Sequence, residues 1–189
     1  MTAPAPAVNR IRLLPDHVAN QIAAGEVVER PASVLKELVE NALDAGAGRV
    51  EVEVRAAGRG LIRVGDDGCG MSRDDALLCL ERHATSKIAA AADLARVTTM
   101  GFRGEAVPSM ASVSRFTLTT RAAGTEAATR VIIHGGKILE VAEAGAPPGT
   151  TVEVRGLFFN LPARRKFLRS DETDRGPPQH GLTTAALAH

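Results

Sequence analysis

The first half of the chain opens with two apolar patterns of helical period. Residues 15–24 predict a short helix, in which Pro15 suits the first turn and Gly25 suits a left-handed C-terminal cap. A second helix is predicted from Pro31 to Ala45, and Gly46 ends it.

Strict alternation of apolar and polar residues then predicts β-strands. The glycines of 57–60 join the first two strands in a hairpin. The predicted strands are 49–55, 61–65, 115–121, 128–134, 137–142 and 150–155. Further helices are predicted at 73–82 and from Glu105, and 83–104 is expected to be a mobile connection containing a short helix. This order predicts an α+β fold, with a mixed or antiparallel sheet and helices on one face, rather than a doubly wound βαβ fold.

The predicted helix over 34–44 carries one polar face. At 100° per residue its polar residues fall in one arc and its apolar residues in the opposite one. The polar residues are Lys36, Glu37, Glu40, Asn41 and Asp44. A solvated surface explains this pattern, but Glu37 and Asn41 lie one turn apart. There a carboxylate could orient water as a general base, and the neighbouring amide oxygen could bind Mg²⁺ held mostly by phosphates.

Three further segments are candidates for nucleotide contacts, and two of them contain glycines. Asp66–Gly70 follows a strand and suits an ordinary turn, yet Asp66 could accept the exocyclic amine of adenine, with Gly68 and Gly70 allowing close backbone approach. Gly101–Ala106 opens a helix and could bind an anion through free N–H groups. Thr85, Ser86 and Lys87 could bind phosphate oxygens. Neither a Walker loop nor a dinucleotide fingerprint occurs in the sequence.

Composition and charge exclude several classes of protein. The net charge of +1 implies no strong partner, so a nucleic-acid surface would have to be local. The densest basic cluster comprises Arg164, Arg165, Lys166 and Arg169. The apolar stretches are too short to span a membrane, and no secretory signal is evident. Two cysteines, Cys69 and Cys79, are expected to be reduced thiols in a cytoplasmic protein.

In this order, four segments resemble the four motifs of the Bergerat-fold ATPases: Glu37 with Asn41, Asp66-x-Gly-x-Gly, Gly101-x-x-Gly, and Gly149-Thr150 at a turn into a strand. Longer strings resemble the MutL family of DNA mismatch repair proteins within that superfamily. These strings are 19–34, 36–46, 82–88, 101–106 and 158–168, within a resemblance that covers about residues 10–170. Histidine kinases and gyrase-type topoisomerases are the sister alternatives. A kinase would need a phosphoacceptor histidine in a preceding helical dimer, and His17 lacks that context.

The resemblance implies a role for each candidate residue. Glu37 would be the general base, Asn41 the Mg²⁺ ligand and Asp66 the adenine acceptor, with Thr150 supporting the adenine side through water. Thr85, Ser86 and Lys87 would belong to a lid over the nucleotide. The phosphates would be wrapped by Gly101, Phe102, Arg103, Gly104 and Glu105.

The resemblance also implies an organisation and a function. Residues 1–170 would form the Bergerat two-layer sandwich, with 1–9 as a loose arm, and 171–189 would be an atypical tail before a second domain. The expected function is Mg²⁺-dependent ATP hydrolysis that drives dimerisation and couples mismatch recognition to strand processing in a bacterial, nucleoid-associated protein. Expected partners are ATP, a second copy, the mismatch-recognition factor and, weakly and without sequence preference, DNA. The alternative is a nucleotide-binding fragment without turnover, because a γ-phosphate-sensing lysine is expected on the next domain.

Overall fold

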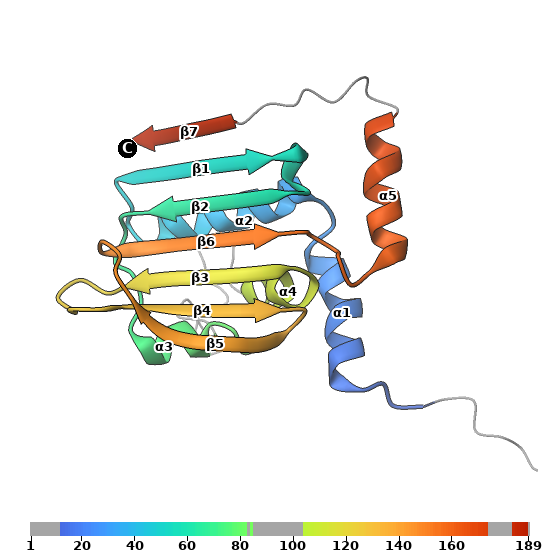
Figure 1. Ribbon diagram of the computed structural model, residues 1–189, viewed down its shortest axis with the longest axis horizontal. Helices are drawn as coiled ribbons and strands as arrows, with labels where there is room; N and C mark the ends of the chain where they lie inside the picture. Colours follow the sequence, from blue (N-terminus) through green and yellow to red (C-terminus); the bar gives the residue numbers. More distant parts are fainter. Residues whose placement is uncertain (1–11, 83, 85–103, 174–182, 189) are drawn as a thin grey trace, which may run out of the picture.

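The computed structural model describes residues 12–82, 84, 104–173 and 183–188, and these residues are built around one sheet (Figure 1). All neighbouring strands run antiparallel, in the order β5-β4-β3-β6-β2-β1-β7. The strands are β1 (Arg49–Arg55), β2 (Leu61–Asp66), β3 (Arg115–Arg121), β4 (Ala128–His134), β5 (Lys137–Ala144), β6 (Gly149–Arg155) and β7 (Thr183–Ala188). The sheet is therefore antiparallel rather than mixed within the described residues.

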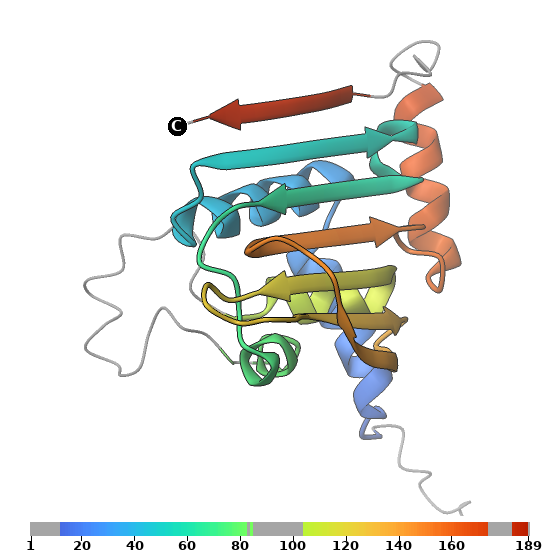
Figure 2. The same ribbon diagram turned by 60° about the vertical axis from the view of Figure 1, so that its left-hand side comes forward.

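Three helices cover one face of this sheet, as the two views show (Figures 1 and 2). They are α2 (Pro31–Asp44), α3 (Arg73–Leu78) and α4 (Ala106–Val113). Helix α1 (Asp16–Val27) packs against α4, and α5 (Pro162–Thr173) stands beside the sheet at the same end as α1. A short 3₁₀ turn, η1 (Ala56–Gly58), closes the β1–β2 hairpin. The predicted α+β sandwich with helices on one face is confirmed.

The core lies between the sheet and the helices. Helix α2 buries Val34, Leu38 and Ala42, which recur every four residues and so form one apolar stripe. From the sheet, β3 buries Phe116 and Leu118 by the alternation of a strand with one covered face. Burial of these apolar side chains holds α2 on the sheet and positions its polar face.

The order of the strands is what assembles the candidate site. Strand β6 comes late in the sequence but lies between β2 and β3. Its register places Thr150 opposite Asp66 on β2 and opposite Thr120 on β3. Residues more than 80 positions apart in the sequence therefore meet at one end of the sheet.

Several predicted boundaries are wrong. Helix α1 continues through Gly25 to Val27, so Gly25 is buried inside the helix and is not its left-handed cap. Helix α3 ends at Leu78, with Cys79 as its cap, instead of reaching residue 82. The sequence pattern predicted neither α5 nor β7, which extends the sheet beyond β1. Most of the connection at 83–104 lies outside the described residues.

Candidate functional site

The polar face of α2 is half-buried rather than freely solvated. Glu37, Glu40 and Asn41 are all partly covered, whereas only Lys36 and Asp44 of the predicted arc are exposed. Lys36 Nζ lies 3.6 Å from Glu40 Oε1, and Glu40 Oε2 is buried with no hydrogen-bond partner in the described part of the chain. Carboxylate and amide oxygens at this depth suit the binding of a cation or a water molecule.

Asp66 ends β2 and joins it to the start of β6. Its Oδ1 accepts hydrogen bonds from the backbone N–H of Gly68, at 2.9 Å, and of Thr150, at 3.3 Å. The first bond shapes the turn after the strand, and the second crosses to the neighbouring strand. Asp66 is the last residue of the strand, so the predicted turn begins one residue later than expected, and the Asp66 carboxylate links two strands.

The environment of Asp66 changes its acidity. Burial of the carboxyl raises its pKa above the ordinary value of 3.8, and the nearby Asp67 raises it further. The hydrogen bonds from Gly68 and Thr150 stabilise the charged form and oppose this rise. A half-buried carboxylate whose hydrogen bonds all reach Oδ1 can use Oδ2 to accept hydrogen bonds from a ligand.

Glycines allow the segments at this end of the sheet to pack closely. Gly70 has φ +64°, and a Cβ on it would lie 1.9 Å from the carbonyl oxygen of Arg121. Gly149 has φ +119°, and its Cβ would lie 2.0 Å from the carbonyl oxygen of Asp66. The space at Gly70 is therefore filled by protein backbone, and the glycine is needed for the fold of the site itself.

The turn after Asp66 contacts the end of α2, and the segment before α4 lies against Ala84. The N–H of Cys69 donates to the carbonyl of Ala45, 3.0 Å away, at the C-terminal end of α2. At the start of α4, Gly104 has φ +62°, and a Cβ there would lie 2.2 Å from the carbonyl oxygen of Ala84. These contacts place the end of α2 beside the Asp66 turn, and the residues just before α4 beside Ala84.

Other predicted residues lie outside this description. Thr85, Ser86, Lys87, Gly101, Phe102 and Arg103 are not among the described residues. In the basic cluster, Arg165 and Lys166 are exposed, whereas Arg164 is half-buried against the protein; for Arg169 the side chain is not described.

Sequence reasoning missed Thr120, which is fully buried on β3. Its Oγ1 lies 2.9 Å from Thr150 Oγ1 and accepts a hydrogen bond, also 2.9 Å long, from the N–H of Met71. The alternation of the strand carried a signal, because Thr120 falls in the same inward phase as Phe116 and Leu118. A hydroxyl at an apolar position of a strand indicates a required hydrogen bond.

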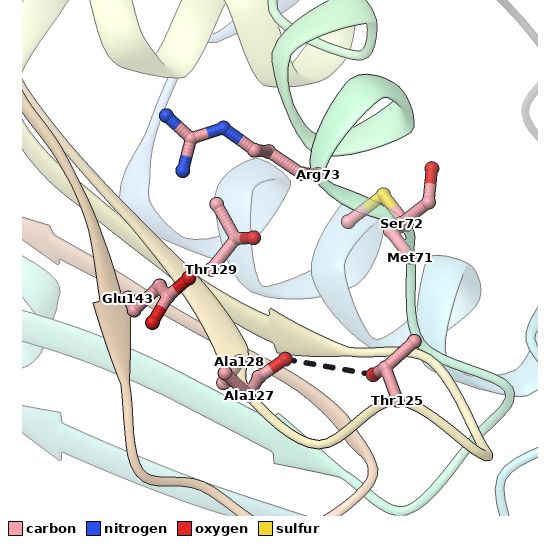
Figure 3. Close-up of a pocket in the computed structure, with 8 residues that line it drawn as sticks. All are labelled: Met71, Ser72, Arg73, Thr125, Ala127, Ala128, Thr129 and Glu143. Atoms are coloured by element: carbon pink, nitrogen blue, oxygen red, sulfur yellow. Dashed lines mark hydrogen bonds between the residues drawn. The ribbon is translucent and has the colours of Figure 1, made fainter.

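A small pocket of about 190 Å³ opens next to Met71 (Figure 3). It lies between the start of α3 and the β3–β4 hairpin, and Glu143 of β5 closes one side. Its other lining residues are Ser72, Arg73, Thr125, Ala127, Ala128 and Thr129. The pocket contains none of the predicted site residues, and Met71 connects it with Thr120.

The described residues contain neither a membrane helix nor a cluster of metal ligands. No helix in this part of the chain combines the length and hydropathy needed to cross a bilayer. Over the same residues, no three or more His, Cys, Asp and Glu side chains gather as a metal site would require. Cys69 and Cys79 are both free thiols, as expected, and burial raises the pKa of Cys79 to about 11.

Known proteins resemble this chain closely in sequence. A family model for histidine kinase-, DNA gyrase B- and HSP90-like ATPases matches residues 29–143. The DNA mismatch repair protein MutL of Syntrophotalea carbinolica is 62% identical over 179 residues, which cover 95% of this chain and 28% of that protein. MutL of Opitutus terrae is 66% identical over 165 residues, covering 87% and 26%. The chain thus spans less than a third of the length of these relatives.

Solved structures share the fold. The Aquifex aeolicus MutL ATPase domain complexed with ADP has a TM-score of 0.57 and 40% identity, covering 79% of this chain and 51% of that one. The N-terminal domain of a DNA repair protein has a TM-score of 0.68 and 27% identity, covering 82% and 44%. The chain belongs to the family of histidine kinase-, DNA gyrase B- and HSP90-like ATPases and, within it, to the ATPase domains of MutL-type mismatch repair proteins.

Proposed function

We propose that this domain binds ATP with Mg²⁺ and hydrolyses it, using the end of the sheet where β2, β6 and β3 meet. The observation that carries this proposal is the hydrogen-bonded pair of Asp66 and Thr150. It supplies a half-buried carboxylate at the position where the family resemblance expects adenine. ADP occupies the related Aquifex aeolicus domain, which supports a nucleotide as the ligand here.

The polar face of α2 would carry the chemistry. Glu37 would accept the proton of the attacking water, and Asn41, one turn later, would supply an oxygen ligand to Mg²⁺. The donor set fits such a metal, because one amide oxygen suffices where phosphates and water complete the coordination. When bound, Mg²⁺ neutralises the charge of the phosphates. The side chains of α2 orient the water and hold its proton.

The phosphates would lie near the start of α4. Gly104 and Glu105 precede this helix, whose first N–H groups point out of its N-terminal end. Such an end attracts anions through free N–H groups and the helix dipole. We further propose that Gly101, Phe102 and Arg103 continue this contact and that Thr85, Ser86 and Lys87 cover the nucleotide.

For the whole protein, we propose that ATP binding drives dimerisation between two copies and so couples mismatch recognition to strand processing. The support is the family membership and the strong similarity to MutL proteins of several bacteria. A mismatch-recognition factor would be the protein partner, and DNA a weak one without sequence preference.

Glu37→Ala tests the proposal directly. The variant should keep its affinity for ATP, measured by calorimetry, and lose roughly 10²- to 10⁴-fold in phosphate release, the usual contribution of a positioned general base. Glu126→Ala, at an exposed position of the β3–β4 turn, is the matched control and should leave both unchanged. Turnover of Glu37→Ala at the parent rate would show that another group is the base. A parent chain that binds ATP without releasing phosphate would be a nucleotide-binding module only.

A further inference from the structure

Thr120 is a hydroxyl in the inward-facing row of β3, whose other buried members are apolar. Its side chain is 0% exposed, and it follows Phe116 and Leu118 on the covered face of β3. A buried hydroxyl without partners costs free energy, so such a group is kept where its hydrogen bonds are satisfied. Thr120 has three partners, one each on the Met71 segment and at Gly149 and Thr150 of β6.

Counting protons fixes the direction of these hydrogen bonds. A threonine hydroxyl has one proton to donate and two lone pairs that accept. The carbonyl of Gly149, 3.1 Å away, can only accept, so it takes the proton of Thr120. The N–H of Met71 can only donate, so it occupies one lone pair of the Thr120 oxygen. The second lone pair then faces Thr150 Oγ1 at 2.9 Å, so Thr150 is the donor of that bond.

This direction determines what Thr150 can offer to a ligand. Its only hydroxyl proton points to Thr120, so the oxygen presents lone pairs alone on its other sides. Its backbone N–H is already donated to Asp66 Oδ1. Asp66, when ionised, is likewise an acceptor only. The pair therefore forms an edge that accepts hydrogen bonds and cannot donate them.

We infer that Thr120 is a specificity-determining residue, which never touches the base but orients Thr150 so that the site selects 6-amino purines over 6-oxo purines. A 6-amino group donates to this edge. A 6-oxo group would bring a third acceptor oxygen against two others, so a 6-oxo purine loses the hydrogen bond at the 6-position and can donate to the pair only through its N1–H. The inference rests on the proposed function, because it assumes that adenine lies against Asp66 and Thr150.

ADP and IDP are the right probes, because they share sugar and phosphates and differ at the 6-position and its N1 neighbour. The ratio of their dissociation constants, measured by calorimetry on the whole chain, reports selection of the base. In Thr120→Val, Thr150 is free to turn and donate to the 6-oxo group, so the preference for ADP should fall about tenfold. One hydrogen bond of about 1.4 kcal/mol corresponds to this change.

Two further variants separate orientation from packing. Thr120→Ser keeps the hydroxyl and should retain the parent ratio. Thr119→Val is the matched control, since Thr119 is the neighbouring residue and lies on the opposite face of β3. It should also retain the ratio. A Thr120→Val protein that loses affinity for ADP and IDP equally would overturn the inference, because a packing defect alone does that.

Thr150→Val tests the same inference without touching the buried position. Removing an oxygen that only accepts should weaken ADP and leave IDP unchanged or tighter. Weakening of IDP as large as that of ADP would mean that Thr150 contacts both bases alike, and the inference would fail. If the parent chain bound neither ADP nor IDP, the proposed nucleotide function itself would fail, which is a different result.

Discussion

The guanidinium of Arg164 occupies the space that a side chain at Gly25 would need. A Cβ on Gly25 would lie 2.3 Å from Nη2 of Arg164. Nη1 of Arg164 donates to the carbonyl of Val28, 3.4 Å away, and the guanidinium carbon lies 5.7 Å from the centre of the Phe158 ring. A cation beside the last carbonyls of a helix is favourable, so Arg164 joins α5 to the C-terminal end of α1.

A double-mutant cycle should show this dependence of Gly25 on Arg164. In an Arg164→Ala background, Gly25→Ala should stabilise the protein by roughly 0.5–1 kcal/mol, the usual gain of alanine over glycine inside a helix. In the parent, the same change displaces the guanidinium, so the gain should vanish or reverse. Urea unfolding of the four proteins measures the coupling. Equal effects of Gly25→Ala in both backgrounds would contradict the contact.

The contacts of Arg164 also show which basic residues of α5 remain exposed for contact with DNA. Arg165 and Lys166 are exposed on α5, whereas Arg164 has partners within the protein. If α5 binds phosphates, replacing Arg165 and Lys166 with alanine should reduce the slope of log K against log salt by roughly 0.9 for each phosphate that is no longer neutralised. Binding to duplex DNA across a salt series measures this slope. Glu126→Ala is the control, and an unchanged slope in the double variant would leave α5 without a role in DNA binding.

The local parts of the fold could be predicted from the sequence, and the long-range parts could not. Alternation of apolar and polar residues identified β1 to β6, and β3 and β4 do bury alternate residues against the helices. The position of β6 between β2 and β3 depends on pairings across the whole chain, which no local period encodes. Gly25 shows the same limit: a glycine there suits a helix end, yet Gly25 lies inside α1, where Arg164, 139 positions later, fills the space that a side chain would need.

The residues of the candidate site divide in the same way, into those that the sequence predicted and those that it did not. Asp66 and its glycines were found because a carboxylate and small residues follow a strand directly. Thr120 was missed because its role depends on Thr150 and Met71, which come from other segments. The residues proposed to bind the nucleotide form a local motif, whereas the residue proposed to orient them is defined only by the assembled sheet.

Asp66→Asn should separate the stability of the domain from its affinity for nucleotide. Burial raises the pKa of Asp66 above 3.8, so between that value and the raised pKa the folded protein holds more protons than the unfolded one. The contribution of Asp66 to the free energy of unfolding is therefore fully present below pH 3.8 and is lost as pH rises through the raised pKa. At neutral pH, Asp66→Asn should be at least as stable as the parent.

Binding should change in the opposite direction. The amide of Asp66→Asn can still accept from Gly68 and Thr150, but it places a donor where adenine needs an acceptor. Loss of a charged acceptor costs about 1.5–3 kcal/mol, so affinity for ADP should fall roughly 10- to 150-fold. Calorimetry and urea unfolding from pH 4 to 8 measure both effects. Parent affinity for ADP in the variant would remove Asp66 from the site.

The C-terminal end of α4 is held by four hydrogen bonds, one from its own cap residue Ser114 and three from other segments. Ser114 Oγ donates to the carbonyl of Met110 at 2.6 Å, and the N–H of Gly136 to that of Ala111 at 2.9 Å. Asn160 Nδ2 reaches the carbonyl of Ser112 at 2.9 Å, and the N–H of Phe158 reaches that of Val113 at 2.7 Å. Each carbonyl that a helix end leaves unpaired is thus satisfied. The opposite end of α4 is the proposed phosphate site.

Asn160→Ala should therefore destabilise the domain by about 1–3 kcal/mol, because it leaves the buried carbonyl of Ser112 without a donor. Asn160→Asp should cost more than Asn160→Ala, since it sets a carboxylate against a carbonyl at the negative end of the helix dipole. Thr125→Ala is the matched control: Thr125 Oγ1 also donates to a backbone carbonyl, that of Ala122 at 2.8 Å, but at an exposed turn where water replaces it. Its effect should stay within about 0.5 kcal/mol. Urea unfolding ranks the three variants, and an Asn160→Asp protein as stable as the parent would show that Asn160 does not cap α4.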